Sequence, residues 1–253
     1  MKYLVSSAIL AAALGCAASA SAVELTLIAP GGFRQAGTQL IAEFEKKTGN
    51  TVKATFGSGG GTKARVVKGE PFDVPIVQPP YQDVIASGHV VATSETPVAN
   101  VAVGLAVRAG APKPDISNAE AVKKLLLSAK AIAYPDAANG AGAGVSFDET
   151  LKKLGIYDQV QAKRKPAQGG AGAMALLAKS EVDYGLTYMS EILPEPGVEA
   201  VGPLPKDIAP PTYLIGFVGK DSKNPDAAKA LLAFLTSPEA AAVYKARGME
   251  PGK

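Results

Sequence analysis

The sequence predicts an α/β fold built on a mostly parallel sheet. Short apolar runs alternate with longer amphipathic runs, and segments rich in glycine separate them. In residues 24–29 polar and apolar residues first alternate and then give way to an apolar run, which predicts a strand. A Pro-Gly-Gly turn follows. Residues 35–47 then place Leu40, Ile41 and Phe44 at helical spacing. Repetition of this order along the chain is typical of strand–loop–helix units.

The alternation continues to the end of the chain. Further strands are predicted at residues 51–56, 72–77, 101–107, 131–134, 184–188 and 213–218. Further helices are predicted at residues 63–68, 118–127, 146–154, 173–179, 225–235 and 237–247. Glycine-rich loops are expected at residues 57–62, 139–144 and 169–172.

The first residues predict a cleaved export signal. Lys2 supplies a positive charge, and residues 4–15 form an apolar run too short to span a bilayer. Ala20-Ser21-Ala22 has the small-x-small pattern of a signal peptidase site, so residues 1–22 are the predicted signal peptide and Val23 the mature N-terminus. Lipid anchoring at Cys16 is the alternative, although Ala13 stands where a lipobox has leucine. We expect the mature protein in the periplasm.

Composition excludes several classes of function. The chain has one cysteine, one histidine and no tryptophan, and its formal net charge is +3. Such a mild charge with few aromatics argues against nucleic-acid binding. With Cys16 removed by cleavage, no cysteine remains for a disulfide or a metal site, and we expect no metal and no cofactor. The single histidine, His89, is expected in a surface turn.

Several loops between strands and helices favour an anion site. The segments 30–33, 57–62, 139–146 and 169–172 each precede a predicted helix. The first N–H groups of a helix have no intrahelical partner, and the helix dipole is positive there. In open α/β sheets such loops converge at the carboxyl ends of the strands. None of these loops has the spacing of a phosphate loop or of a full dinucleotide fingerprint.

These segments carry a resemblance to a known family. The runs ELTLIAPGGF at 24–33 and AEFEKKTGNTVKATFGSGGGTKARVVKGEPFDVPIV at 42–77 resemble the opening of type II periplasmic solute-binding proteins, in particular the molybdate-binding group. AYPDAANGAG at 133–142, VDYGLTYMSEILPEPGVEAVGPLP at 182–205 and NPDAAKALLAFLTSPEAAAVYKARGMEP at 224–251 continue the likeness. It covers essentially the whole mature chain.

The resemblance implies two α/β lobes, joined by two crossing strands, that close around a ligand. Lobe 1 would comprise residues 23–108 and 203–253, and lobe 2 residues 109–202. Molybdate-binding relatives hold the oxyanion with a serine and backbone donors from each of two loops and with a tyrosine. Ser58 matches the second serine and Tyr188 the tyrosine, but Gly32 stands at the first serine.

The missing hydroxyl shifts the expected ligand toward an organic carboxylate, with a molybdate-like oxyanion kept open. Arg34, Lys63 and Arg65 lie just past the first two loops, and an arginine fork suits a planar carboxylate. Solvated cations at helix starts are the alternative interpretation. The candidate ligand-binding residues are Gly32, Phe33, Arg34, Ser58, Gly59, Gly60, Thr62, Lys63, Asn139, Gly140, Gly170 and Tyr188.

The expected function is that of the substrate-binding protein of an ABC-type importer, acting as a monomer with a small anion and an inner-membrane permease as partners. The segment at 190–205 also resembles a branch that includes a periplasmic aconitate isomerase. That alternative enzyme would need a proton carrier, for which Tyr188 and Asp136 are the candidates, with Glu149 a third. Whether the chain is an enzyme stays open, and a binding protein is favoured.

Overall fold

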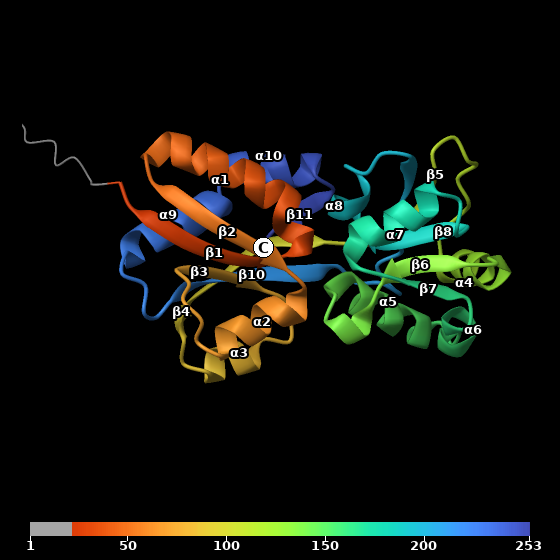
Figure 1. Cartoon of the computed structure of the whole chain (residues 1–253), viewed down its shortest axis with the longest axis horizontal. Coiled ribbons are helices and arrows are strands. Elements are labelled where there is room, and N and C mark those ends of the chain that lie inside the picture. The colour runs from red at the N-terminus through yellow and green to blue at the C-terminus, as the bar shows by residue number, and fades with distance from the viewer. Residues whose placement is uncertain (1–21) are drawn as a thin grey trace, which may run out of the picture.

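The computed structural model describes residues 22–253, so Cys16 and nearly all of the predicted signal peptide lie outside the described residues. Figure 1 shows two lobes side by side along the long axis of the molecule. Each lobe is built around its own sheet. The predicted α/β class is confirmed.

The first sheet has six strands in the order β11-β4-β10-β3-β1-β2. Strands β1, β2 and β3 are parallel, whereas β10 and β11 pair antiparallel with their neighbours. The strands are β1 (Glu24–Pro30), β2 (Thr51–Gly57), β3 (Val74–Val77), β4 (Val90–Val101), β10 (Thr212–Gly219) and β11 (Met249–Pro251).

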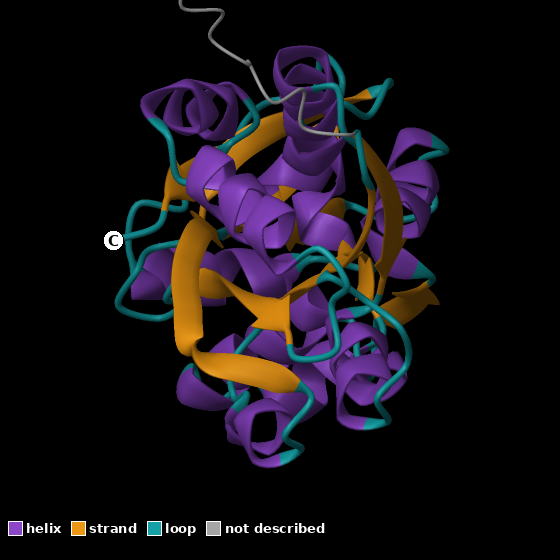
Figure 2. Ribbon diagram, turned by 90° about the vertical axis from the view of Figure 1, so that its left-hand side faces the viewer, coloured by secondary structure: helices purple, strands orange, loops and turns teal. Residues whose placement is uncertain are grey.

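Helices cover both faces of this sheet, and Figure 2 views them from the end of the first lobe. Helix α1 follows a short 3-10 turn, η1, directly after β1. The bounds are η1 (Gly31–Phe33), α1 (Arg34–Thr48), α2 (Gly59–Val67), α3 (Gln82–Ala86), α9 (Pro225–Leu235) and α10 (Pro238–Ala246).

The second sheet has five strands in the order β7-β6-β8-β5-β9, with β6, β7 and β8 parallel. Its strands are β5 (Val103–Arg108), β6 (Ile132–Pro135), β7 (Arg164–Ala167), β8 (Tyr184–Tyr188) and β9 (Val198–Pro203). Its helices are α4 (Ala119–Ser128), η2 (Ala137–Asn139), α5 (Gly142–Lys153), α6 (Tyr157–Gln161), α7 (Gly169–Ala178) and α8 (Met189–Ile192).

The chain passes between the sheets twice, once from β4 to β5 and once from β9 to β10. The first passage is a single residue, Ala102, between the two strands. Strand β5 pairs with β8 and β9, so hydrogen bonding places residues 103–108 with the second sheet rather than with the first. The lobe boundaries expected after Arg108 and at 203 stay predictions. The chain leaves the first sheet for the second at Ala102.

Several elements differ from the sequence-based prediction. The predicted strand at 101–107 is two strands, because β4 runs back to Val90 and pairs with both β10 and β11. The expected loops at 57–62 and 169–172 are mostly helix: α2 begins at Gly59 and α7 at Gly169. The Ser58 hydroxyl oxygen accepts the Gly61 N–H and so caps α2 four residues earlier than predicted.

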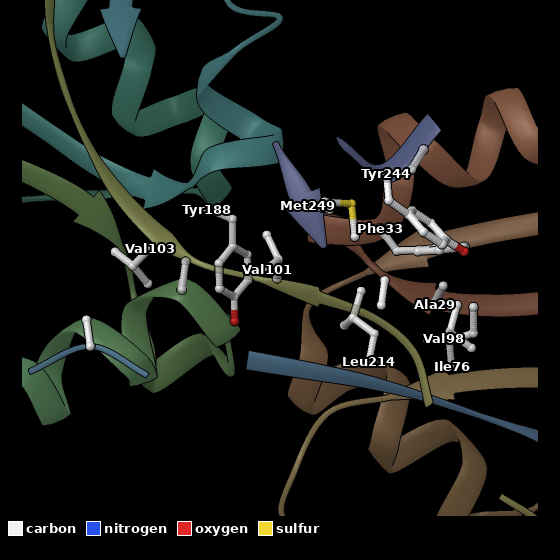
Figure 3. Packing of buried hydrophobic residues seen from close by; sticks show 14 of the residues in the cluster. Ala29, Phe33, Ile76, Val98, Val101, Val103, Tyr188, Leu214, Tyr244 and Met249 are labelled. Carbon is white, nitrogen blue, oxygen red and sulfur yellow. The ribbon is translucent and has the colours of Figure 1, made fainter. Parts of the chain in front are cut away.

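The core of the first lobe joins η1 to α10. The rings of Phe33 and Tyr244 are fully buried, with centroids 6.2 Å apart. Figure 3 shows these rings beside Met249, with Ala29, Ile76 and Val98 below them. Among the described helices, none combines the length and the hydropathy needed to cross a bilayer.

Tyr244→Phe tests this packing. The buried Tyr244 hydroxyl donates to the Leu235 backbone oxygen at 2.8 Å, so its removal leaves a buried carbonyl without that donor. We expect a loss of about 1 kcal/mol in unfolding free energy, or a Tm lower by roughly 2–4 °C. Tyr213→Phe is the matched control, because Tyr213 is 51% exposed and should be neutral. Equal Tm values for the two variants in a calorimetric scan would contradict this account.

Candidate functional site

A cavity of about 440 Å³ lies between the two sheets. It forms where the carboxyl ends of the parallel strands of both lobes meet. The last residues of β1, β2, β6, β7 and β8 and the residue after β3 all line it: Pro30, Gly57, Pro135, Ala167, Tyr188 and Gln78. Open α/β sheets bind ligands at this edge, and the volume suits a small molecule.

Four helix N-termini reach the same cavity. Gly31 and Gly32 open α1 through η1, Ser58 and Gly59 open α2, Ala141 and Gly142 open α5, and Gly169 and Gly170 open α7. Two of these starts come from each lobe. The unpaired first N–H groups and the positive ends of the helix dipoles therefore favour negative charge in the cavity.

The lobes contact each other directly around the cavity. The Gly60 N–H donates to the Gly140 carbonyl at 3.0 Å, and the Ser190 hydroxyl donates to the Gly32 carbonyl at 2.8 Å. Each bond joins an element of the first lobe to one of the second, so the described arrangement is a closed one. A Cβ built on Gly60 would lie 3.1 Å from the Gly140 Cα. A side chain at position 60 would therefore have to push the Gly140 backbone away for the lobes to close this far.

Tyr188 closes the inner wall of the cavity. Its side chain is 2% exposed, and its hydroxyl group accepts from Gln78 Nε2 at 3.2 Å and donates to Thr212 Oγ1 at 3.1 Å. Figure 3 shows its hydroxyl extending away from the crossing strand toward the gap between the lobes. Burial raises the pKa of the Tyr188 phenol, so the group stays protonated and acts as a hydrogen-bond donor.

Arg34 is the cation placed at the cavity wall. Its guanidinium lies 5.0 Å from the centroid of the Phe56 ring, and Nη2 donates to the Phe56 carbonyl at 3.2 Å. Both contacts hold the side chain near the start of α1, where it lines the cavity. Lys63 and Arg65 are engaged elsewhere: Lys63 donates to the Pro80 carbonyl, and Arg65 Nε lies 2.6 Å from Glu70 Oε2.

Asp136 also lines the cavity, but it is held by its own lobe. Arg164 Nη2 lies 2.9 Å from Asp136 Oδ1, which also accepts the Ala138 N–H. The hydrogen bond from Arg164 is the main reason that the Asp136 pKa lies below its usual value. An ionised carboxylate paired in this way is a weak proton acceptor near neutral pH.

Glu191 is a cavity residue that sequence reasoning missed. It stands one turn after Tyr188 on the short helix α8, and it lines the cavity between the starts of α1 and α7. Thr187 donates to Glu191 Oε2 at 2.5 Å. Burial raises the Glu191 pKa, against lowering effects from the Thr187 hydroxyl, the Tyr188 backbone and the Arg34 charge.

Gln78 was missed as well. It follows the fully buried strand β3, is 7% exposed, and reaches across the lobes to Tyr188. A Cβ built on Gly59 would lie 2.0 Å from Gln78 Oε1, and one built on Gly142 would lie 2.3 Å away. The sequence did contain a signal for Gln78: it is a polar residue directly after an apolar strand, and ligands bind at the carboxyl ends of parallel strands.

The structure places the predicted site residues in several different surroundings. Those that line the cavity are Gly32, Arg34, Ser58, Gly59, Asn139, Gly170, Tyr188 and Asp136. Gly60, Lys63, Gly140 and Glu149 line a neighbouring cavity of about 300 Å³ instead. The Phe33 ring is buried in the core and Thr62 is 3% exposed within α2. His89 lies in a third cavity, beside Gly69. The binding roles of all these residues stay predictions.

Residues 25–250 match the family model described as bacterial extracellular solute-binding protein. The chain is 31% identical over 250 residues to an aconitate isomerase of Pseudomonas sp., covering 96% of this chain and 94% of the relative. It is 27% identical over 229 residues to a molybdate-binding protein of Escherichia coli strain K12, covering 89% of this chain and 88% of the relative.

The fold is similar to that of the periplasmic molybdate-binding protein of Azotobacter vinelandii. The TM-score is 0.74 at 22% identity, over 89% of this chain and 98% of the other. The resemblance found in the sequence, to type II solute-binding proteins and their molybdate-binding group, is confirmed. Among residues 22–253, no group of three or more His, Cys, Asp or Glu side chains is placed to hold a metal ion.

Gly60→Ala tests the contact between the lobes. Alanine favours the helix by about 1 kcal/mol over glycine, but its Cβ meets Gly140 at 3.1 Å in the closed form. We expect a folded protein with a larger radius of gyration by small-angle X-ray scattering, because overpacking the contact costs about 1–3 kcal/mol. Gly172→Ala in α7 is the control, since its Cβ would meet Ala167 at an ordinary 3.7 Å. Equal radii for both variants would contradict the inference.

Proposed function

Because the chain belongs to the family of bacterial extracellular solute-binding proteins, we propose that it binds a small organic anion in the cavity between its lobes and delivers it to an ABC-type importer. The molybdate-binding relatives and the predicted signal peptide support export to the periplasm and an inner-membrane permease as partner. The proposed ligand is a carboxylate, with a tetrahedral oxyanion as the alternative.

The observation that carries this proposal is the convergence of four helix N-termini on one cavity that both lobes line. Their backbone donors are neutral and fixed, so they bind an anion without a rearrangement of charged side chains. Ser58 and Tyr188 add hydroxyl groups to the wall, and Arg34 adds a positive charge. These groups come from both lobes, and a bound anion therefore joins them.

Gly32 favours a carboxylate over a tetrahedral oxyanion. A Cβ built on Gly32 would lie 2.7 Å from Tyr188 Cδ2, so the Tyr188 ring occupies the space that a serine side chain would need at this position. The first hydroxyl donor that the molybdate resemblance implies is thereby excluded. Arg34, whose Nη2 also donates to the Phe56 carbonyl, contributes guanidinium N–H donors at the wall instead, and such donors suit the oxygens of a carboxylate.

Binding would shift the equilibrium between open and closed forms. A ligand that contacts both lobes interacts with the closed form more strongly, and the closed population rises by that difference in affinity. The bonds from Gly60 to Gly140 and from Ser190 to Gly32 already join the lobes, so the ligand adds to an existing contact. The importer would recognise the closed form.

We expect a di- or tricarboxylate to raise the Tm of the mature protein more than molybdate, tungstate or sulfate does. A ligand at about 100 times its Kd contributes roughly 2.7 kcal/mol to unfolding free energy. Arg34→Ala should weaken carboxylate binding by about tenfold or more in calorimetry, because it removes a charged hydrogen-bond donor.

Arg65→Ala is the matched control for Arg34→Ala. Arg65 is also an arginine on a lobe 1 helix, in the last turn of α2, but it pairs with Glu70 and does not line the cavity. We expect its carboxylate Kd to equal that of the unchanged protein. Sub-micromolar molybdate binding with no response to any carboxylate would refute the proposed ligand class.

An aconitate isomerase is the second candidate function, and the 31% identical relative favours it. None of the three predicted proton carriers suits the role, and Glu149 lines the neighbouring cavity rather than this one. Asp136 is held ionised by Arg164, and Tyr188 keeps its proton because burial raises its pKa. A proton acceptor for catalysis works best with a pKa near the operating pH. We therefore favour binding without turnover.

Incubation with cis- or trans-aconitate, followed by ultraviolet absorbance of the double bond, separates the two functions. We expect no turnover above buffer, for the reasons given by the two pKa shifts. Tyr188→Phe and Asp136→Asn are the variants to compare if turnover appears. Turnover that either change abolishes while binding is retained would assign a base and make the chain an enzyme.

A further inference from the structure

Glu191 is an acidic side chain in a cavity whose other features favour an anion. Its carboxyl group lies between the first turns of two helices from different lobes. A Cβ built on Gly31 would lie 3.3 Å from Glu191 Oε1, and one built on Gly170 would lie 2.6 Å from Oε2. A bound anion that uses either helix start would therefore be close to this carboxyl group.

The carboxyl group is held in place. Thr187 donates to Oε2 at 2.5 Å, and Ser190, its neighbour on α8, donates to the Gly32 carbonyl of the first lobe. Both Thr187 and Ser190 are almost fully buried. Glu191 is thus next to the contact between the lobes, and turning its carboxyl group away from the cavity would break the bond from Thr187.

Few charges surround Glu191. Arg34 on α1 is the cation that acts on it, but among residues 22–253 no salt bridge joins Glu191 to a basic side chain. Glu195, which follows α8, acts in the opposite direction. Tyr188 on β8 keeps its proton. Across the cavity, Asp136 is paired with Arg164.

The other elements that pack against α8 have no charged side chain close to Glu191. Helix α7 has no charged residue between Gly169 and Ala178. Strand β5 meets β8 at Val103 and Tyr188, and its charged residue Arg108 lies five positions further along. Glu199 on β9 lies opposite Val107, near that same end, and is 3.7 Å from Lys113. Arg34 is therefore the nearby positive charge that stabilises the ionised form of Glu191.

We propose that Glu191 takes up one proton when an anion binds, and that the protonated carboxyl group then donates a hydrogen bond to a carboxylate oxygen of the ligand. The proposal rests on the proposed function, because it needs the ligand in this cavity. Two unit charges about 4 Å apart repel by roughly 4 kcal/mol near a protein surface. A shared proton removes this repulsion, as when two carboxyl groups occupy one site.

The proposal fixes the sign of the pH dependence. Burial raises the Glu191 pKa in the free protein, and the charge of the ligand raises it further in the complex. Between these two pKa values the complex holds more protons than the free protein. Affinity is therefore greatest below the pKa of the free protein, falls as pH rises by up to about tenfold per pH unit, and levels off above the pKa of the complex.

Isothermal titration calorimetry of the mature protein tests this directly. The probes are trans-aconitate and propane-1,2,3-tricarboxylate, with molybdate as a parallel arm. Each titration is repeated in two buffers of different ionisation enthalpy at several values between roughly pH 5 and 8. For the unchanged protein, we expect an uptake that approaches about one proton per ligand, after correction for protons on the free ligand.

Three variants separate Glu191 from its surroundings. Glu191→Gln keeps the shape without the titration, so proton uptake should fall to about zero and the pH dependence should flatten. Glu195→Gln is the matched control, since Glu195 affects the Glu191 pKa but does not line the cavity, and uptake should persist. Thr187→Val removes the hydrogen bond that lowers the Glu191 pKa, so the pH range of uptake should move upward.

The outcomes are distinct. A probe that binds the unchanged protein with no net proton uptake, or uptake that survives Glu191→Gln, overturns the role of Glu191 and leaves the proposed function standing. Binding of no probe at any pH overturns the proposed function, and the role of Glu191 falls with it. If Glu191→Gln does not fold, the uptake by the unchanged protein and its shift in Thr187→Val decide the question.

Discussion

The closed form depends on the close approach of helix first turns to the opposite wall of the cleft. Gly142 of the second lobe faces Gln78 of the first, and Gly60 meets the backbone of Gly140. A Cβ would lie 2.3 Å from Gln78 Oε1 at Gly142 and 3.1 Å from the Gly140 Cα at Gly60, so either side chain would force its neighbour to shift. The glycines thus serve two ends, because they let the lobes meet and they leave backbone N–H groups uncovered at the helix starts.

This constraint decides the electrostatics of the site. Among the described residues that line the cavity, Arg34 is the only basic one, so the positive field comes mainly from helix N-termini. Such a field is strong inside a closed cleft, where the effective dielectric constant is lower than in water. The two carboxyl groups in the wall have different partners. Asp136 forms a salt bridge with Arg164, whereas Glu191 accepts hydrogen bonds mainly from hydroxyl and backbone donors.

The sequence predicted the elements whose patterns are local. Strand β8 and helix α9 have the predicted bounds, because their apolar periodicity and flanking residues suffice. Strand β4 was largely missed, since residues 91–97 are mostly exposed, contain Pro97 and pair with β10 through shifted register. Ser58 and Arg34 were predicted from their positions in and just past the loops after strands, and Tyr188 from the family resemblance; all three line the cavity. Glu191 was not predicted, because it reaches the cavity only where α8 contacts η1. That contact joins Ser190 to Gly32, which are 158 positions apart in the sequence.

The position of Glu191 also bears on how a binding protein and an isomerase can share one fold. Both need an anion held by fixed neutral donors, and an isomerase needs in addition a group that exchanges a proton with the bound molecule. A carboxyl group whose pKa is raised by burial, and which lines the cavity, meets the chemical part of that need. What distinguishes the two functions is then where its proton goes. Transfer to a ligand oxygen strengthens binding and leaves the ligand unchanged, whereas exchange with a ligand carbon moves a double bond. The favoured function is the first of these, in which the proton is shared between two oxygen atoms and the ligand is released unchanged.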